Sequence, residues 1–181
     1  MAATLTEDIE ADHYVNHTNF SPDNSKLVYF QIIQPKRSRR SIQLGIYDLR
    51  SNTNEIIEKD RLVSHYCWKN SNQIIVTTRD KNLNWYYTLY TINTKEKVDL
   101  KLPFRLDGHP MSSPFSENII ITDTTPDKKR NHHICIVDIH TREVQELAAV
   151  FTPLKYNGPV RCDSHPRWNR SGNMICIDAA D

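Results

Sequence analysis

Hydrophobic residues in this chain gather in short runs separated by polar turns, and the same order of runs returns four times. Each return begins at a histidine, passes through a short strand and a polar turn, and enters an apolar strand. Few windows have the 3.6-residue spacing of an amphipathic helix, so the pattern predicts strands rather than helices. The four segments are His17–Phe30, His65–Thr77, His109–Ile121 and His165–Ile177.

The first three repeats also continue alike. Each has a charged loop, a third strand such as Leu44–Leu49, a polar turn and a fourth strand such as Asn54–Ile57, whereas Ala148–Lys155 is expected to be a loop or a single turn. Four-stranded units at a period of roughly 45 to 55 residues are typical of a β-propeller, which closes with four to eight blades. A β-sandwich also has short strands, but it would not repeat the same turn residues.

The predicted fold class is therefore all-β, a partial propeller of about three and a half four-stranded blades. Residues 1–16 are expected to form a polar segment or strand, and residues 17–181 the blades. The repeats start near residues 17, 65, 109 and 165, and the last is truncated at Asp181. Such a chain is expected to be a fragment, or to need the remaining blades or an oligomer to close the ring.

Composition narrows the class of partner and the compartment. The formal net charge of +1 over 181 residues gives no bulk attraction to nucleic acid or to an anionic membrane. The polar N-terminal segment has no apolar core of a signal peptide, and no stretch approaches the roughly 20 apolar residues of a membrane span. We therefore expect a cytoplasmic protein without nucleic-acid or membrane partners, with buried, unreactive thiols at Cys67, Cys135, Cys162 and Cys176.

Two further sequence features have alternative interpretations. The basic loop Lys36–Arg40 and the loop Asp127–Arg130 are expected to be solvated blade loops rather than a nucleic-acid patch. The aromatic run Trp85–Tyr87 is expected to pack within a blade, with stacking on sugar rings as the alternative.

The repeated histidines are the main candidate for chemistry. Equivalent positions in propeller blades lie at equivalent radii, and the first strand of each blade lines the central channel. The repeats thus predict that four histidines point toward one end of that channel, and these are His17, His65, His109 and His165. They form either a metal site with a neighbouring base or hydrogen-bonded structural positions. The other histidines, His13, His132, His133 and His140, are expected at the surface.

The turn motifs resemble those of WD40-like repeats of the TolB type, whose mark is a Ser-Pro-Asp-Gly-Lys turn before an apolar strand. Phe20–Lys26 is close to this motif and Trp168–Asn173 is looser. The segments Asp107–Pro114, Ile120–Asp123 and Cys162–Trp168 resemble oligogalacturonate lyases, which are seven-bladed propellers with manganese on the channel axis.

The lyase resemblance implies roles for particular residues. His109 and His165 correspond to metal ligands, and Asp163 stands where the family has another histidine, while Val160 replaces a glutamine ligand. His65 corresponds to the catalytic base. Arg40 is matched to an arginine that assists catalysis, and Arg167 and His17 are expected to contact the substrate.

The implied reaction is metal-dependent β-elimination on uronate oligosaccharides, in which a neutral histidine removes the C5 proton and a divalent cation, manganese, stabilises the developing charge. The alternative is a non-catalytic propeller that binds a protein or glycan partner. A third possibility is a propeller attached to a hydrolase domain.

Overall fold

The computed structural model describes residues 11–36 and 39–180, and it consists almost entirely of antiparallel β-structure. The chain divides into two compact units, with the boundary between Val63 and Ser64. Across the described residues the one helical segment is a 3-10 turn, η1, at Gly158–Val160. No helix in this part of the chain is long and apolar enough to cross a membrane.

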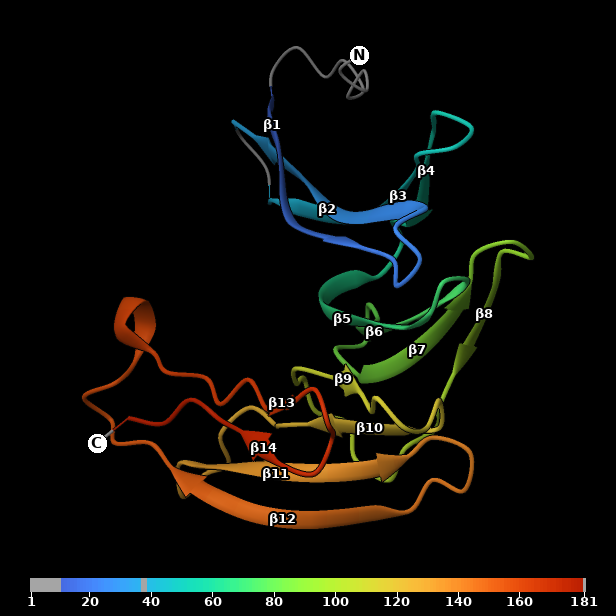
Figure 1. The fold of residues 1–181 in the computed structure, drawn as a ribbon. Coiled ribbons are helices and arrows are strands. Elements are labelled where there is room, and N and C mark those ends of the chain that lie inside the picture. The colour runs from blue at the N-terminus through green and yellow to red at the C-terminus, as the bar shows by residue number, and fades with distance from the viewer. Residues whose placement is uncertain (1–10, 37–38, 181) are drawn as a thin grey trace. The chain divides into compact units, whose positions relative to one another are not determined.

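The first unit holds one four-stranded antiparallel sheet whose strands follow one another in chain order (Figure 1). β1 begins upstream of His17, so the predicted boundary at residue 16 falls inside a strand. The buried apolar side chains of this sheet include Val28, Leu44 and Ile46. The strands are β1 (Ala11–Phe20), β2 (Lys26–Pro35), β3 (Ser41–Asp48) and β4 (Thr53–Glu58).

The turn between β1 and β2 has the conformation that its sequence predicts. Asp23 Oδ1 accepts hydrogen bonds from the hydroxyls of Ser21 and Ser25 at 2.8 Å each, and Asn24 has a φ of 56°. Asp and Asn suit such turns because their short side chains bind nearby backbone or hydroxyl groups and tolerate positive φ.

The second unit repeats this four-stranded meander twice and then begins it again. Its first sheet comprises β5 (Leu62–Asn70), β6 (Gln73–Arg79), β7 (Trp85–Thr91) and β8 (Glu96–Asp99). The next sheet comprises β9 (Met111–Ser112), β10 (Ile119–Thr122), β11 (Asn131–Asp138) and β12 (Val144–Phe151), and a last hairpin pairs β13 (Arg167–Trp168) with β14 (Ile175–Cys176). The all-β class and the four-stranded repeat are thus confirmed.

One hydrophobic cluster joins the two complete sheets of the second unit. Ile75 and Tyr87 from the β5–β8 sheet pack with Ile120, Cys135 and Val137 from the β9–β12 sheet, all at most 5% exposed. Full burial of an aliphatic side chain stabilises a fold by about 1.5–3 kcal/mol. This packing fixes the two sheets against each other, and with them the histidines near the starts of β5 and β9.

Several local expectations were wrong. Ala148–Phe151 is not a loop or turn but the second half of β12, where it pairs with Asn131–Ile134 beyond an irregularity at Ile134 and Cys135. Strand pairing overrides the weak β-propensity of the alanines. His132 is not at the surface: it is 1% exposed, and its Nδ1 lies 2.9 Å from the carbonyl oxygen of Thr124. It faces inward because it alternates in step with buried Ile134.

The cysteines also differ from one another. All four are free thiols, but Cys135 is buried while Cys176, expected to be buried, is exposed. In the short strand β14 the alternation of side chains turns Ile175 inward and Cys176 outward.

Candidate functional site

Three of the four repeated histidines meet in the second unit. His65 lies on β5, while His109 and His165 lie just before β9 and β13. The ring centroids of His65 and His109 are 3.8 Å apart, and those of His109 and His165 are 4.1 Å apart. We call these residues the histidine cluster. Each comes from the first strand of a successive repeat or the residues just before it, so the repeat itself brings them together.

A carboxylate stands behind each imidazole. Asp107 Oδ1 lies 3.3 Å from His65 Nδ1, and Asp123 contacts His109 Nδ1 at 2.9 and 3.0 Å through its two oxygens. On the last hairpin, Asp178 Oδ2 lies 3.3 Å from the Nδ1 of the third histidine, His165. In all three pairs the carboxylate meets the same ring nitrogen.

These contacts determine which nitrogen of each imidazole ring carries the proton. Burial alone would raise the pKa of Asp107, but hydrogen bonds from His65, Ser64 and Thr77 and the attraction of the imidazole outweigh it and hold that pKa below its usual value. The pKa of Asp123 is lowered in the same way, by His109 and two backbone N–H groups against the effect of burial. An ionised carboxylate only accepts, so Nδ1–H donates to it and the neutral ring keeps its lone pair on Nε2.

Asp123 connects two neighbouring repeats. Its side chain is 1% exposed, and besides the imidazole it accepts the backbone N–H of His109 at 2.7 Å and that of His165 at 3.1 Å. His165 has a φ of 39°, in the left-handed region that non-glycine residues rarely adopt. A single buried carboxylate thus fixes the backbone of two members of the histidine cluster.

The third histidine has a more open setting. Asp178, which contacts His165, also takes a two-pronged ion pair from Arg167 at 2.6 and 3.2 Å. Arg167 lowers the pKa of Asp178, and the carboxylate in turn raises the pKa of the guanidinium. About half of the Arg167 side chain is exposed, so its charge stands at the solvent edge of the cluster.

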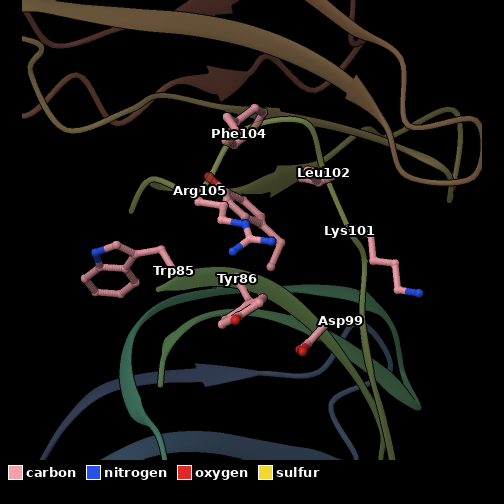
Figure 2. Close-up of a pocket in the computed structure, with 8 residues that line it drawn as sticks. Trp85, Tyr86, Asp99, Lys101, Leu102, Phe104 and Arg105 are labelled. Atoms are coloured by element: carbon pink, nitrogen blue, oxygen red, sulfur yellow. The ribbon is translucent and has the colours of Figure 1, made fainter. Parts of the chain in front are cut away.

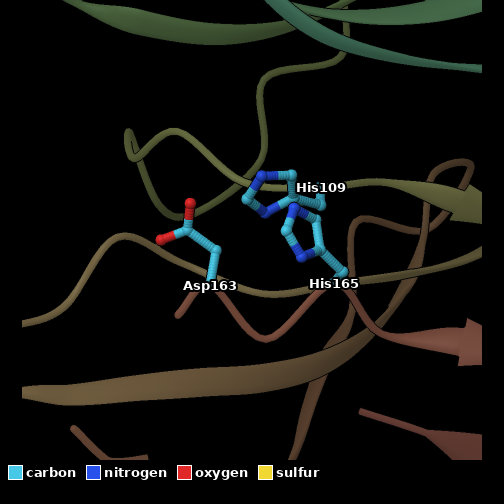
Figure 3. A group of neighbouring side chains, drawn as sticks. All are labelled: His109, Asp163 and His165. Atoms are coloured by element: carbon cyan, nitrogen blue, oxygen red, sulfur yellow. The ribbon is translucent and has the colours of Figure 1, made fainter. Parts of the chain in front are cut away.

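The predicted metal ligands lie together. Donor atoms of His109, Asp163 and His165 all lie within 4.8 Å of one another (Figure 3). At this separation the three side chains form a candidate site for one divalent cation. Two imidazoles and a carboxylate suit manganese, zinc or iron. However, Arg161 already contacts Asp163 Oδ2 at 2.7 and 2.8 Å, and this contact would compete for the carboxylate.

The remaining residues that the sequence singled out lie on other elements of the chain. His17 belongs to the first unit, where its ring packs 5.3 Å from that of Phe30. Arg40 is exposed on the β2–β3 connection of the same unit. Val160 is 61% exposed in the turn η1 and offers no ligand atom. Roles for His17 and Arg40 remain predictions.

Sequence reasoning gave no role to the three orienting aspartates or to Arg161. Asp107 and Asp123 lie inside the segments that resemble the lyase family, and Asp107 is only two residues before His109. The spacing from each histidine to its carboxylate differs between repeats, so no sequence period identifies the pairs.

Comparison with known proteins identifies the fold. No protein-family model and no curated protein sequence matches the chain. Solved structures do: an oligogalacturonate lyase in complex with manganese has a TM-score of 0.64 at 15% identity, over 95% of this chain and 48% of that one. TolB from Acinetobacter baumannii has 0.60 at 13%, over 91% and 43%. An acylaminoacyl peptidase from Pyrococcus horikoshii has 0.66 at 10%, over 92% and 28%.

These similarities, together with the repeated four-stranded sheets, show a β-propeller fold. The chain spans about half the length of the lyase and of TolB. It therefore corresponds to part of a complete propeller of that size.

Proposed function

We propose that this chain forms part of a metal-dependent lyase that cleaves uronate oligosaccharides by β-elimination. The observation that carries the proposal is the histidine cluster, in which three imidazoles from successive repeats touch and each is held through Nδ1 by a carboxylate. This arrangement leaves three Nε2 lone pairs for a metal and for a proton. The structural similarity to a manganese-bound oligogalacturonate lyase supports the choice of reaction and cation.

In this proposal His65 is the general base. Its Nδ1 is held by Asp107 at 3.3 Å and by Ser64 Oγ at 3.1 Å, and its side chain remains 26% exposed. It takes the proton from C5 of the uronate ring. A C4–C5 double bond forms, and the C4–oxygen glycosidic bond breaks, with the departing oxygen taking up a proton.

His109, His165 and Asp163 are the residues that would hold the cation. A divalent cation, when bound, stabilises negative charge that develops on the uronate carboxylate during proton removal. Asp123 holds the backbone and ring of His109, so that the donor set is arranged before the ligand arrives. Arg167 supplies a fixed positive charge beside His165 for a second carboxylate of the oligosaccharide.

The test separates metal binding from elimination. We expect the purified chain to bind Mn²⁺, and His109→Ala and His165→Ala each to lose that binding. His65→Ala should keep Mn²⁺ but lose formation of the unsaturated product from oligogalacturonate. His133→Ala is the matched control, because this histidine also contacts two carboxylates, Asp127 and Glu146, outside the cluster. Unchanged Mn²⁺ binding in both ligand variants would overturn the metal assignment.

A non-catalytic propeller that binds a glycan or protein is the second candidate. Arg161 favours it, since this guanidinium occupies one oxygen of Asp163 in the place of a cation. The two candidates differ in one measurement, the release of unsaturated product by the unaltered chain in the presence of Mn²⁺. A lyase releases this product, whereas a binding propeller binds oligogalacturonate and releases none.

A further inference from the structure

A pocket outside the histidine cluster lies where β7 meets the segment that joins β8 to β9 (Figure 2). Its volume is about 320 Å³, at the lower end of the range of about 300–1,000 Å³ for small-ligand sites. We call it the aromatic pocket. It is lined by Trp85, Tyr86, Tyr87, Asp99, Lys101, Leu102, Phe104 and Arg105.

The aromatic side chains of the pocket are held in place from behind. The hydroxyl of Tyr86 donates to Asp80 Oδ2 at 3.1 Å, and the guanidinium of Arg79 lies 5.3 Å from the centre of the Trp85 ring. Trp85 and Tyr86 line the pocket and remain partly exposed. Tyr87, in contrast, belongs to the hydrophobic cluster between the two sheets. Fixed, partly exposed aromatic faces form a platform on which the C–H face of a sugar ring can stack.

The polar groups of the pocket complement this platform. Figure 2 shows the guanidinium of Arg105 directed toward the aromatic side chains, and its central carbon lies 5.9 Å from the centre of the Tyr86 ring. Asp99, which accepts a hydrogen bond from Thr88 Oγ1 at 2.8 Å, adds a carboxylate acceptor. An exposed guanidinium suits a carboxylate, and an acceptor beside it suits hydroxyl groups.

The wall of the pocket packs against the residues that support the histidine cluster in the same unit. Arg105 stands two residues before Asp107, the carboxylate that holds His65. Tyr87, at the back of the pocket, contacts Thr122 Oγ1 at 2.7 Å, next to Asp123. A Cβ placed on Gly108 would lie 2.6 Å from the Tyr87 hydroxyl, so the pocket wall packs against the backbone beside His109.

We propose that the aromatic pocket binds an acidic sugar ring, with the ring stacked on Trp85 and its carboxylate on Arg105. The ligand class follows from an aromatic platform combined with one exposed guanidinium and one acceptor carboxylate. Binding at the pocket stands on these observations alone. Its use as an added subsite for a longer chain of uronates rests on the proposed function.

The experiment measures binding where the metal cannot contribute. Trigalacturonate is titrated into the full chain in the presence of EDTA, with neutral maltotriose as the comparison. Trp85→Ala and Arg105→Ala should each weaken trigalacturonate binding about tenfold or more, since a hydrogen bond to a charged group or a stacked ring contributes a factor of that order. Arg170→Ala, an exposed arginine of the last hairpin, is the matched control and should leave the affinity unchanged.

The outcomes separate the two proposals. Wild-type affinity in both pocket variants, or no binding by the unaltered chain in EDTA, overturns the pocket assignment. Binding lost in His109→Ala but kept in Arg105→Ala also overturns it, because the saccharide then sits at the histidine cluster. Pocket binding that persists in a protein without Mn²⁺-dependent elimination supports the pocket and contradicts only the lyase proposal.

Discussion

Asp123→Asn is the substitution that tests the candidate site most directly. Asp123 is buried in the second unit and receives the backbone N–H of His109, the backbone N–H of His165 and the Nδ1–H of His109 at 2.7 to 3.1 Å. Asparagine has nearly the same shape but only one acceptor oxygen, and its amide nitrogen donates. At least one of the three donors must then face an N–H group instead of an oxygen.

The size of the effect follows from these contacts. A hydrogen bond to a charged group contributes about 1.5–3 kcal/mol, so loss of one should lower the free energy of unfolding by about 2–3 kcal/mol. An amide that donates to His109 Nδ1 also moves the ring proton to Nε2, which removes the lone pair a cation needs. Loss of such an orienting partner typically costs 10–100-fold in metal affinity, and we expect a decrease of about that size for Mn²⁺.

The assay combines urea unfolding with calorimetric titration of Mn²⁺, performed on protein that is folded at the start of both experiments. Asp127→Asn is the matched control, since Asp127 also contacts a histidine, His133, but lies outside the cluster. The control should bind Mn²⁺ like the unaltered chain. Mn²⁺ affinity in Asp123→Asn within twofold of the unaltered chain would refute the argument that this carboxylate sets the ring proton of His109.

Three further outcomes are expected. The backbone N–H groups of Thr141 and His140 lower the pKa of Asp138. The stabilising effect of its carboxylate is therefore complete above the ordinary aspartate pKa of about 3.9 and is lost as pH falls through the lower pKa of the folded state. In urea unfolding, the stability of Asp138→Asn should depend less on pH below pH ~4 than that of the unaltered chain. Gly108→Ala should lower the thermal unfolding temperature, at a cost of roughly 1–3 kcal/mol, because the added Cβ would lie 2.0 Å from the carbonyl oxygen of Asp123; an unchanged temperature would contradict this. A thiol reagent should modify exposed Cys176 first and leave Cys135, whose pKa burial raises to about 11, unreacted in the folded protein, as mass spectrometry of partly labelled protein would show.

The repeat could be predicted from the sequence because its turns contain residue types that favour tight turns. The loop Asn169–Asn173 illustrates this: Asn169 Oδ1 accepts the backbone N–H of Asn173 at 3.0 Å, and Gly172 adopts a φ of 63°. Residues that bind their own backbone or tolerate positive φ mark such turns wherever they recur. The order of strand, turn and strand was therefore visible, and with it the near alignment of His65, His109 and His165.

The partners of these histidines were not visible, because they depend on contacts between distant residues. Asp107 reaches His65 across 42 positions of sequence, whereas Asp123 reaches back 14 positions to His109. Burial of such carboxylates is a property of packing, which no local pattern encodes. The same limit applies to Ala148–Phe151, where pairing with β11 decides the conformation and the alanines themselves do not.

The arrangement also explains how a site of this kind is compatible with very low sequence identity to other propellers. The positions of His65, His109 and His165 are set by where the successive repeats begin, which turns and core packing control. Asp123 accepts hydrogen bonds from the backbone N–H groups of His109 and His165, at the beginnings of two repeats. These two hydrogen bonds do not depend on the side chain at either position. The chemistry at this end of the unit is thus decided by a few residues, and substitution of those residues, rather than overall similarity, is the measurement that assigns it.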